Sequence, residues 1–285
     1  MQLMKNSGVL LLLWGVVVQG VCAQAAADVA ISPDFTLGLA LGQTQYRATE
    51  RNALGNVTNQ ESGSLPRAMV TGRWQHGEWF AEAALSVARH DVAYQGFTQI
   101  GIPLTTTTAL AMTQSGLQGG RRWRSSSSAQ WQVSSGLERL QIQRHILPGL
   151  GSSPLREVLT TTRAMASVAV QQDLPATWVS APVALSVGLD VMPALRSRLD
   201  VDSFGVFDPI TLQPARSTDW RVKLKTELAL SRQASLWLGY MHESLQPGGS
   251  SLEVWTRGGV PTAGVRYPGS QQSLRTLSMG LSLGF

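Results

Sequence analysis

The chain has 285 residues, of which 43% are hydrophobic and 14% charged, and its mean hydropathy is +0.01. A typical soluble domain carries about 25% charged residues, and a helical membrane protein is far more apolar than this chain, so the composition fits neither class. The single cysteine excludes a disulfide scaffold, and a net charge of +5 without a basic cluster argues against a nucleic-acid partner.

Residues 1–23 have the pattern of a secretory signal peptide. Lys5 supplies the positive charge, residues 8–18 form the apolar stretch, and the small-residue cleavage site ends at Ala23. This stretch of about 11 residues is much shorter than the roughly 20 that a spanning helix needs. We therefore expect export through the Sec pathway, cleavage of the leader, and a short periplasmic segment at residues 24–33.

The remaining residues, 34–285, alternate between apolar side chains and polar or small ones, which is typical of β-strands. In the clearest run, 220–230, one face carries Trp, Val and Leu while the other carries Arg, Lys and Glu. Ten such segments are predicted, beginning near Phe35, Leu65, Glu78, Thr107, Ala129, Leu159, Val183, Thr218, Ser235 and Gln271. The segment from Ala129 changes phase near Glu138 and Arg139, which predicts a β-bulge there.

The connections between these segments differ in length. Those at 76–77, 124–128 and 232–234 are short, and the link at 172–182 is longer than they are. The other connections are long and rich in Gly, Pro, Ser and Thr; they are predicted at 51–64, 95–106, 147–158, 200–217 and 246–270. Tight turns at one end and long loops at the other are typical of an outer-membrane barrel.

These patterns predict an all-β fold: a single transmembrane antiparallel up-and-down β-barrel of about ten strands, with eight or twelve as alternatives. A secreted β-sandwich also alternates, but its outer face should be rich in charge, whereas the polar face here is mostly Gly, Ala, Ser and Thr. Tryptophans near segment ends further favour aromatic girdles at two membrane interfaces; these are Trp74, Trp79, Trp123, Trp131, Trp220 and Trp237.

The last segment resembles the C-terminal assembly signal of Gram-negative outer-membrane proteins. It ends in Phe, with apolar residues at alternate positions before it: Leu277, Met279, Leu281, Leu283 and Phe285. The resemblance implies a location in the cell outer membrane, contact with its lipid and lipopolysaccharide, and recognition by the barrel-assembly machinery and periplasmic chaperones. Physically, the last strand must pair with the first, because an open sheet edge in hydrocarbon leaves backbone groups unsatisfied.

Apolar faces turned to lipid would direct the charges of the other face into the lumen. The predicted lumen-lining charges are Arg67, Arg73, Glu82, Glu138, Arg163, Asp190, Arg221, Lys223, Lys225 and Glu227. One interpretation is an internal salt-bridge network that fills a narrow barrel; the other is a constricted pore that favours anions. Because no catalytic motif is found, the predicted function is non-enzymatic: a narrow transport or export pore, or a barrel that displays loops for interaction.

A ten-stranded barrel also invites comparison with the omptins, outer-membrane proteases. That resemblance implies an alternative catalytic group at the extracellular mouth, made of His90, Asp91, Asp200 and Asp202, whose acids and histidine could position a water. Ordinary rim residues are the competing interpretation of this short match. The four histidines show no metal-ligand spacing, so we expect neither a metal nor a cofactor.

Overall fold

The computed structural model describes residues 34–52, 54–97, 102–125, 128–149, 152–174 and 182–285. The expected signal peptide at residues 1–23 and the expected periplasmic segment at 24–33 lie outside the described residues. Among the residues that are described, no helix is both long and apolar enough to cross a membrane.

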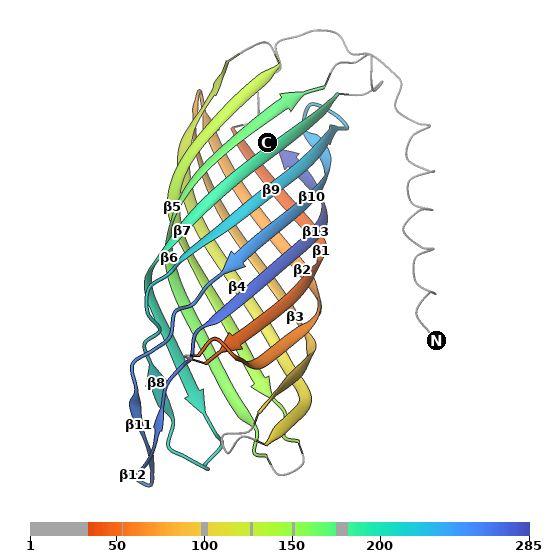
Figure 1. The fold of residues 1–285 in the computed structure, drawn as a ribbon. Coiled ribbons are helices and arrows are strands. Elements are labelled where there is room, and N and C mark those ends of the chain that lie inside the picture. The colour runs from red at the N-terminus through yellow and green to blue at the C-terminus, as the bar shows by residue number, and fades with distance from the viewer. Residues whose placement is uncertain (1–33, 53, 98–101, 126–127, 150–151, 175–181) are drawn as a thin grey trace, which may run out of the picture. The chain divides into compact units, whose positions relative to one another are not determined.

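Ten antiparallel strands form a closed barrel wall (Figure 1), as predicted. They are β1 (Phe35–Arg51), β2 (Val57–His76), β3 (Trp79–Phe97), β4 (Pro103–Arg124), β5 (Ala129–Ile146), β6 (Leu155–Asp173), β7 (Val183–Asp202), β9 (Thr218–Ala229), β10 (Ala234–Leu245) and β13 (Ser270–Gly284). Each strand pairs with its neighbours in the chain, and the β1–β13 pairing closes the ring. The short strand β8 (Ile210–Leu212) extends the sheet beside β7, and β11 (Glu253–Arg257) and β12 (Val260–Val265) form a separate hairpin.

The barrel has two ends, which we name by their connections. The turn end carries the C-terminus and the β2–β3, β4–β5, β6–β7 and β9–β10 connections, and the loop end carries the other connections with β8 and the β11–β12 hairpin (Figure 1). Three of the loops predicted to be long, 51–64, 95–106 and 147–158, are partly strand, since β2, β4 and β6 begin within them. These strands have 19 to 22 residues, about twice what a membrane crossing requires.

In the turn-end half of the barrel, the outer face is apolar. On β1, Leu37, Leu39 and Leu41 face outward and alternate with the inward residues Gly38 and Ala40, and the other strands repeat this pattern. Leu39 is 50% exposed although it lies within a regular sheet. A continuous exposed apolar belt of this kind is what contact with hydrocarbon requires. We therefore place the lipid bilayer around the turn-end half.

In the loop-end half, the apolar face turns inward. Further along the same strands, buried apolar residues fill the interior and pack against β8 and the final loop; this apolar core consists of Tyr46, Ala48, Leu65, Ala88, Val92, Leu110, Met112, Leu140, Ile142, Leu159, Leu199, Val201, Leu212, Leu245, Trp255, Tyr267 and Leu274. The outer face here is polar, with Arg47, Gln141 and Arg198 among its residues. This half is therefore built like a water-soluble domain, with its apolar side chains inside.

The reversal explains the phase change that we predicted to be a bulge in β5. The prediction is wrong: β5 keeps an unbroken register with both β4 and β6 through Glu138 and Arg139. Glu138 and Leu140 face the same interior, so the character of the face changes while the orientation of the side chains does not. The irregularity near this level lies in β7, where Leu195 is the extra residue opposite Thr162 and Arg163.

The tryptophans are only in part where the girdle was predicted. Trp74, Trp79, Trp123 and Trp131 sit on the outer face at the turn end, and Trp123 and Trp131 are direct cross-strand partners. Trp237 instead is buried inside the barrel, which corrects its assignment to a girdle. Its indole lies against Gly280, where an added Cβ atom would come within 2.5 Å of the ring. A glycine on β13 is thus what lets a large side chain turn inward.

The final strand joins both ends of the chain into the ring. Leu277, Met279, Leu281 and Leu283 face outward, and β13 pairs along its length with β1 on one side and β10 on the other. The Phe285 amide donates a hydrogen bond to the Phe35 carbonyl oxygen at 2.9 Å. The apolar C-terminal residues therefore belong to the lipid-facing belt and to the seam of the barrel.

We predict that a cation is tolerated on the outer face of β1 only beyond the belt. Leu39→Arg should lower the free energy of unfolding in lipid vesicles by about 2–4 kcal/mol, because it places a charge in hydrocarbon. Gln45→Arg, six positions further along the same face of the strand, should change it by less than about 1 kcal/mol. Urea titration of both variants in vesicles measures the difference, and equal losses would contradict the assigned position of the bilayer.

Candidate functional site

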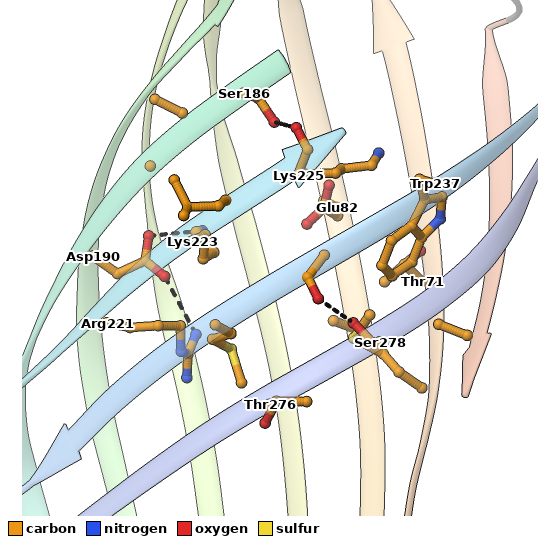
Figure 2. Close-up of a pocket in the computed structure, with 18 of the residues that line it drawn as sticks. Thr71, Glu82, Ser186, Asp190, Arg221, Lys223, Lys225, Trp237, Thr276 and Ser278 are labelled. Carbon is orange, nitrogen blue, oxygen red and sulfur yellow. Dashed lines mark hydrogen bonds and ion pairs between the residues drawn. The ribbon is translucent and has the colours of Figure 1, made fainter. Parts of the chain in front are cut away.

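The turn-end half of the lumen contains a cavity of about 380 Å³. Small inward residues on the neighbouring strands β1, β10 and β13 leave this space; they include Ala40, Gly42, Gly239 and Ser278. Six cationic and four anionic side chains line the cavity: Arg67, Arg73, Arg122, Arg221, Lys223, Lys225, Glu82, Glu138, Asp190 and Glu227. Figure 2 shows how several of them converge from β3, β7 and β9.

The inner end of the cavity is closed by a layer of buried charges, which we call the ionic layer: Arg163, Arg221, Glu138, Asp190, Asp219 and Glu243. Arg163 is fully buried on β6; its guanidinium contacts Asp219 at 2.8 Å and Glu243 at 2.9 Å and pairs with Glu138. Arg163 thereby joins carboxylates from β5, β9 and β10, so the layer connects distant parts of the wall.

Arg221 on β9 completes the ionic layer. It contacts Glu138 at 2.9 Å, Glu243 at 3.1 Å and Asp190 at 3.3 Å, and Lys223 binds the second oxygen of Asp190 at 2.8 Å. Figure 2 shows Asp190 between these two cations. Charges buried this deeply persist only when they are paired and hydrogen-bonded, and every member of the layer has such a partner.

Nearer the loop end, a second charged group is embedded in the apolar core. Arg144 on β5 contacts Glu50 at 2.8 Å, Glu61 at 3.0 Å and Glu157 at 2.5 Å. The Thr108 hydroxyl donates to the other oxygen of Glu61 at 2.7 Å. One guanidinium therefore holds together carboxylates from β1, β2 and β6, and this group together with the apolar core fills the loop-end half of the lumen.

The structure brings the predicted lumen residues together. Nine of the ten line the cavity, and the tenth, Arg163, is buried beside it. Sequence reasoning missed Asp219 and Glu243 in the ionic layer, and Arg144 with its three carboxylates. Glu243 shares the inward face of β10 with Trp237, so assigning Trp237 to a girdle hid the orientation of the whole strand.

The alternative catalytic residues lie far apart. His90 and Asp91 are on β3 and Asp200 and Asp202 on β7, with β4, β5 and β6 between them. Four steps between neighbouring strands correspond to about 19 Å along the sheet. Asp200 accepts hydrogen bonds from Arg198 and Thr211 instead, and Asp202 accepts one from the Phe204 amide. The two pairs therefore lie on different parts of the wall, and both aspartates already accept hydrogen bonds from residues of their own part of the chain.

Asp208 anchors the β11–β12 hairpin at the loop end. Its carboxylate accepts hydrogen bonds from the Thr256 hydroxyl at 2.6 Å and from the Gly259 and Gly258 amides at 2.9 and 3.0 Å. The Trp255 indole donates to the Asp208 carbonyl oxygen at 2.8 Å. The Thr256 hydroxyl first, and then the two amides, hold the pKa of Asp208 below its ordinary value of 3.8, since they stabilise the charged form.

The sequence also matches a known protein family. Residues 20–241 match the family model of the autotransporter β-domain, and no curated protein sequence matches the chain. The outer membrane protease OmpT from Escherichia coli is similar in structure, with a TM-score of 0.65 and 9% identity over 92% of this chain and 99% of that one. At this identity the similarity concerns the barrel fold alone.

Two further solved structures are similar with lower scores. The translocator domain of autotransporter NalP from Neisseria meningitidis has a TM-score of 0.45 at 13% identity, over 87% of this chain and 88% of that one. The Pseudomonas putida toluene transporter TodX has a TM-score of 0.34 at 10% identity, over 90% and 91% of the two chains.

We predict that the ionic layer depends on Arg163. Arg163→Met should lower the free energy of unfolding by about 3–5 kcal/mol, because it leaves buried carboxylates without their cation. Arg198→Met removes an exposed pair with Asp200 and should cost at most about 1 kcal/mol. Denaturant titration measures both, and adding Glu243→Gln to the first variant should restore part of the loss. A loss from Arg163→Met no larger than that from Arg198→Met would contradict the prediction.

The hairpin should loosen in acid. Because the pKa of Asp208 is lowered by folding, its contribution is complete above its ordinary value of 3.8 and disappears as the pH falls through the lowered pKa. The NMR signal of the Trp255 indole N–H should shift in that acidic range and show no such shift in Asp208→Asn. Asp202→Asn changes another acid in the same loop and should keep the shift of the Trp255 signal. If the wild-type protein shows no such shift, Asp208 does not anchor the hairpin as described.

Proposed function

The chain belongs to the autotransporter β-domain family, and we propose that this outer-membrane β-barrel acts through the structure it presents at its loop end and does not conduct solutes. The observation that carries the proposal is the filled lumen. Behind the cavity lies the ionic layer, where Arg163, Asp190 and Glu243 have 0% exposure. Beyond it, Leu65, Leu110, Ile142 and Leu274, all from different strands, are at most 1% exposed.

The distribution of apolar residues supports a structural role for the loop-end half. A conducting pore needs an open path for its solute, whereas the interior of this half is filled by packed, buried apolar side chains. Burying each large aliphatic side chain contributes about 1.5–3 kcal/mol, so the core makes the outer half a stable platform. Platforms of this kind can hold loops in a fixed arrangement for contact with a partner.

The loop end is the side expected to face the exterior of the cell, since outer-membrane barrels have short turns on the periplasmic side and longer loops outside. The β11–β12 hairpin exposes Leu252 just before it, Val254 within it and Val260 on its second strand. Exposed apolar side chains on an anchored hairpin favour contact with another molecule. We place the interaction surface there.

Outward cations support the expected contact with lipopolysaccharide. On the outer face just beyond the apolar belt, Arg139 on β5 and Arg196 on β7 flank Thr162 on β6 as neighbours across the sheet. Guanidinium groups at this level can bind the phosphates of lipid headgroups. The barrel-assembly machinery is a further proposed partner, through the strand that ends at Phe285.

We predict that the folded protein does not raise the conductance of a planar bilayer above that of a protein-free membrane, because the ionic layer and the apolar core block the lumen. Folding is verified by the shift in gel mobility on heating. Steady unit currents with anion preference, altered by Lys223→Glu together with Lys225→Glu, would contradict the proposal and favour the narrow pore. Peptide cleavage lost in Asp202→Ala would instead favour the protease alternative.

A further inference from the structure

The cavity has a cationic rim that the proposed function does not use. Arg122 lies on β4 and lines the cavity near the turn end. Among the described residues, no carboxylate lies within 4.0 Å of its guanidinium. Arg73 on β2 has one carboxylate neighbour, Glu82, at 3.6 Å, and its Nε atom is buried without a hydrogen-bond partner. The rim therefore holds one guanidinium without a carboxylate neighbour and, on Arg73, one buried N–H donor without a partner.

The fold brings these two arginines to one place. A guanidinium nitrogen of Arg73 donates to Gln132 Oε1 at 2.9 Å, and Gln132 on β5 is the direct cross-strand partner of Arg122. The Arg73 guanidinium also stacks on the ring of Phe80 in a cation–π contact, with the guanidinium carbon 4.0 Å from the ring centre. Arg73 thus binds the residue directly opposite Arg122, and this neutral amide can donate a hydrogen bond but carries no charge to compensate either arginine.

Lys225 from β9 supplies a further cation to the same cavity. It pairs with Glu227 at 2.7 Å and lies 5.4 Å from the ring centre of Trp237. Its side chain is 37% exposed, in contrast to the buried ionic layer. The ionic layer and the apolar core close the cavity toward the loop end. The exposure of Lys225 therefore means that the cavity is reached from the turn end.

A guanidinium without a counter-ion is costly in a partly desolvated wall. A doubly charged oxyanion would remove this cost, since arginines form charge-assisted, bidentate hydrogen bonds with phosphate. The cavity, at about 380 Å³, has room for such a group and a small organic substituent.

We propose that the cavity is a binding site for phosphate or a small phosphate ester, which enters from the turn end and is held by Arg73 and Arg122 with help from Lys225 and Gln132. The ionic layer makes the site a dead end, so the ligand binds and leaves by the same opening. The turn end is the expected periplasmic side, so the ligand would come from the periplasm.

The test is calorimetric titration of the folded barrel in detergent with inorganic phosphate at low ionic strength. We expect saturable binding to one site, weakened roughly tenfold or more in Arg122→Gln, because a hydrogen bond to a charged group is lost. Arg121→Gln is the matched control: Arg121 is the next residue on β4, but it points outward and pairs with Glu78. Its phosphate affinity should equal that of the wild type.

Thermal unfolding gives a second readout that a merely structural role would not produce. Without phosphate, Arg122→Gln should be at least as stable as the wild type, since it removes a cation without a partner; with phosphate, it should gain less stability than the wild type. No saturable binding, equal weakening by Arg121→Gln, or equally tight binding of acetate, a monoanion, would each overturn the proposal. None of these outcomes depends on whether the barrel conducts.

Discussion

Each long strand of this barrel passes through two surroundings, and its apolar face must change sides where the surroundings change. Hydrocarbon surrounds the turn-end half, so apolar side chains face outward there and polar ones face the lumen. Water surrounds the loop-end half, so apolar side chains turn inward and form a core. The backbone continues without a break through this change, as the register of β5 across Glu138 and Arg139 shows.

The same constraint explains why the lumen contains charge at all. In the membrane-embedded half, the interior is the only place for polar side chains, and a narrow barrel leaves little water to solvate them. Mutual pairing is then required, and Arg163 and Arg221 each bind three carboxylates. Replacing such groups with apolar ones can be neutral for stability; the role we assign to the ionic layer is to connect strands from opposite parts of the wall and close the lumen.

Much of the fold could be predicted from alternation and turn signals alone. The ten strands and their antiparallel order follow from local patterns, because most strands in a barrel contact their neighbours in the chain. The closing role of the residues before Phe285 was predicted from their resemblance to an assembly signal and from the cost of an open sheet edge in hydrocarbon. Loop lengths could not be predicted in this way, since the pattern reverses beyond the bilayer and the outer halves of β2, β4 and β6 lose the alternation expected of a membrane strand. The assumption that the apolar face always points outward also produced the false bulge in β5.

The sequence could predict which charged residues face the lumen, but not how they pair with one another. Inward charges on β7 and β9 stood out because their strands alternate strictly, whereas Glu243 was hidden by Trp237, whose inward position depends on the absent side chain of Gly280. Which carboxylate meets which arginine depends on the stagger of strands around the ring, and one sequence does not reveal it. Arg221 binds three carboxylates, whereas Arg122 has none within 4.0 Å among the described residues, and this difference likewise appears only in three dimensions.

The central claim, that the membrane covers only the turn-end half, is tested most directly by spin labels attached at single cysteines along β1. A label at position 39 should be accessible to oxygen dissolved in the lipid, and a label at position 45 to a water-soluble nickel reagent. The account is contradicted if position 45, on the same face of the strand, shows the oxygen accessibility of a residue in hydrocarbon.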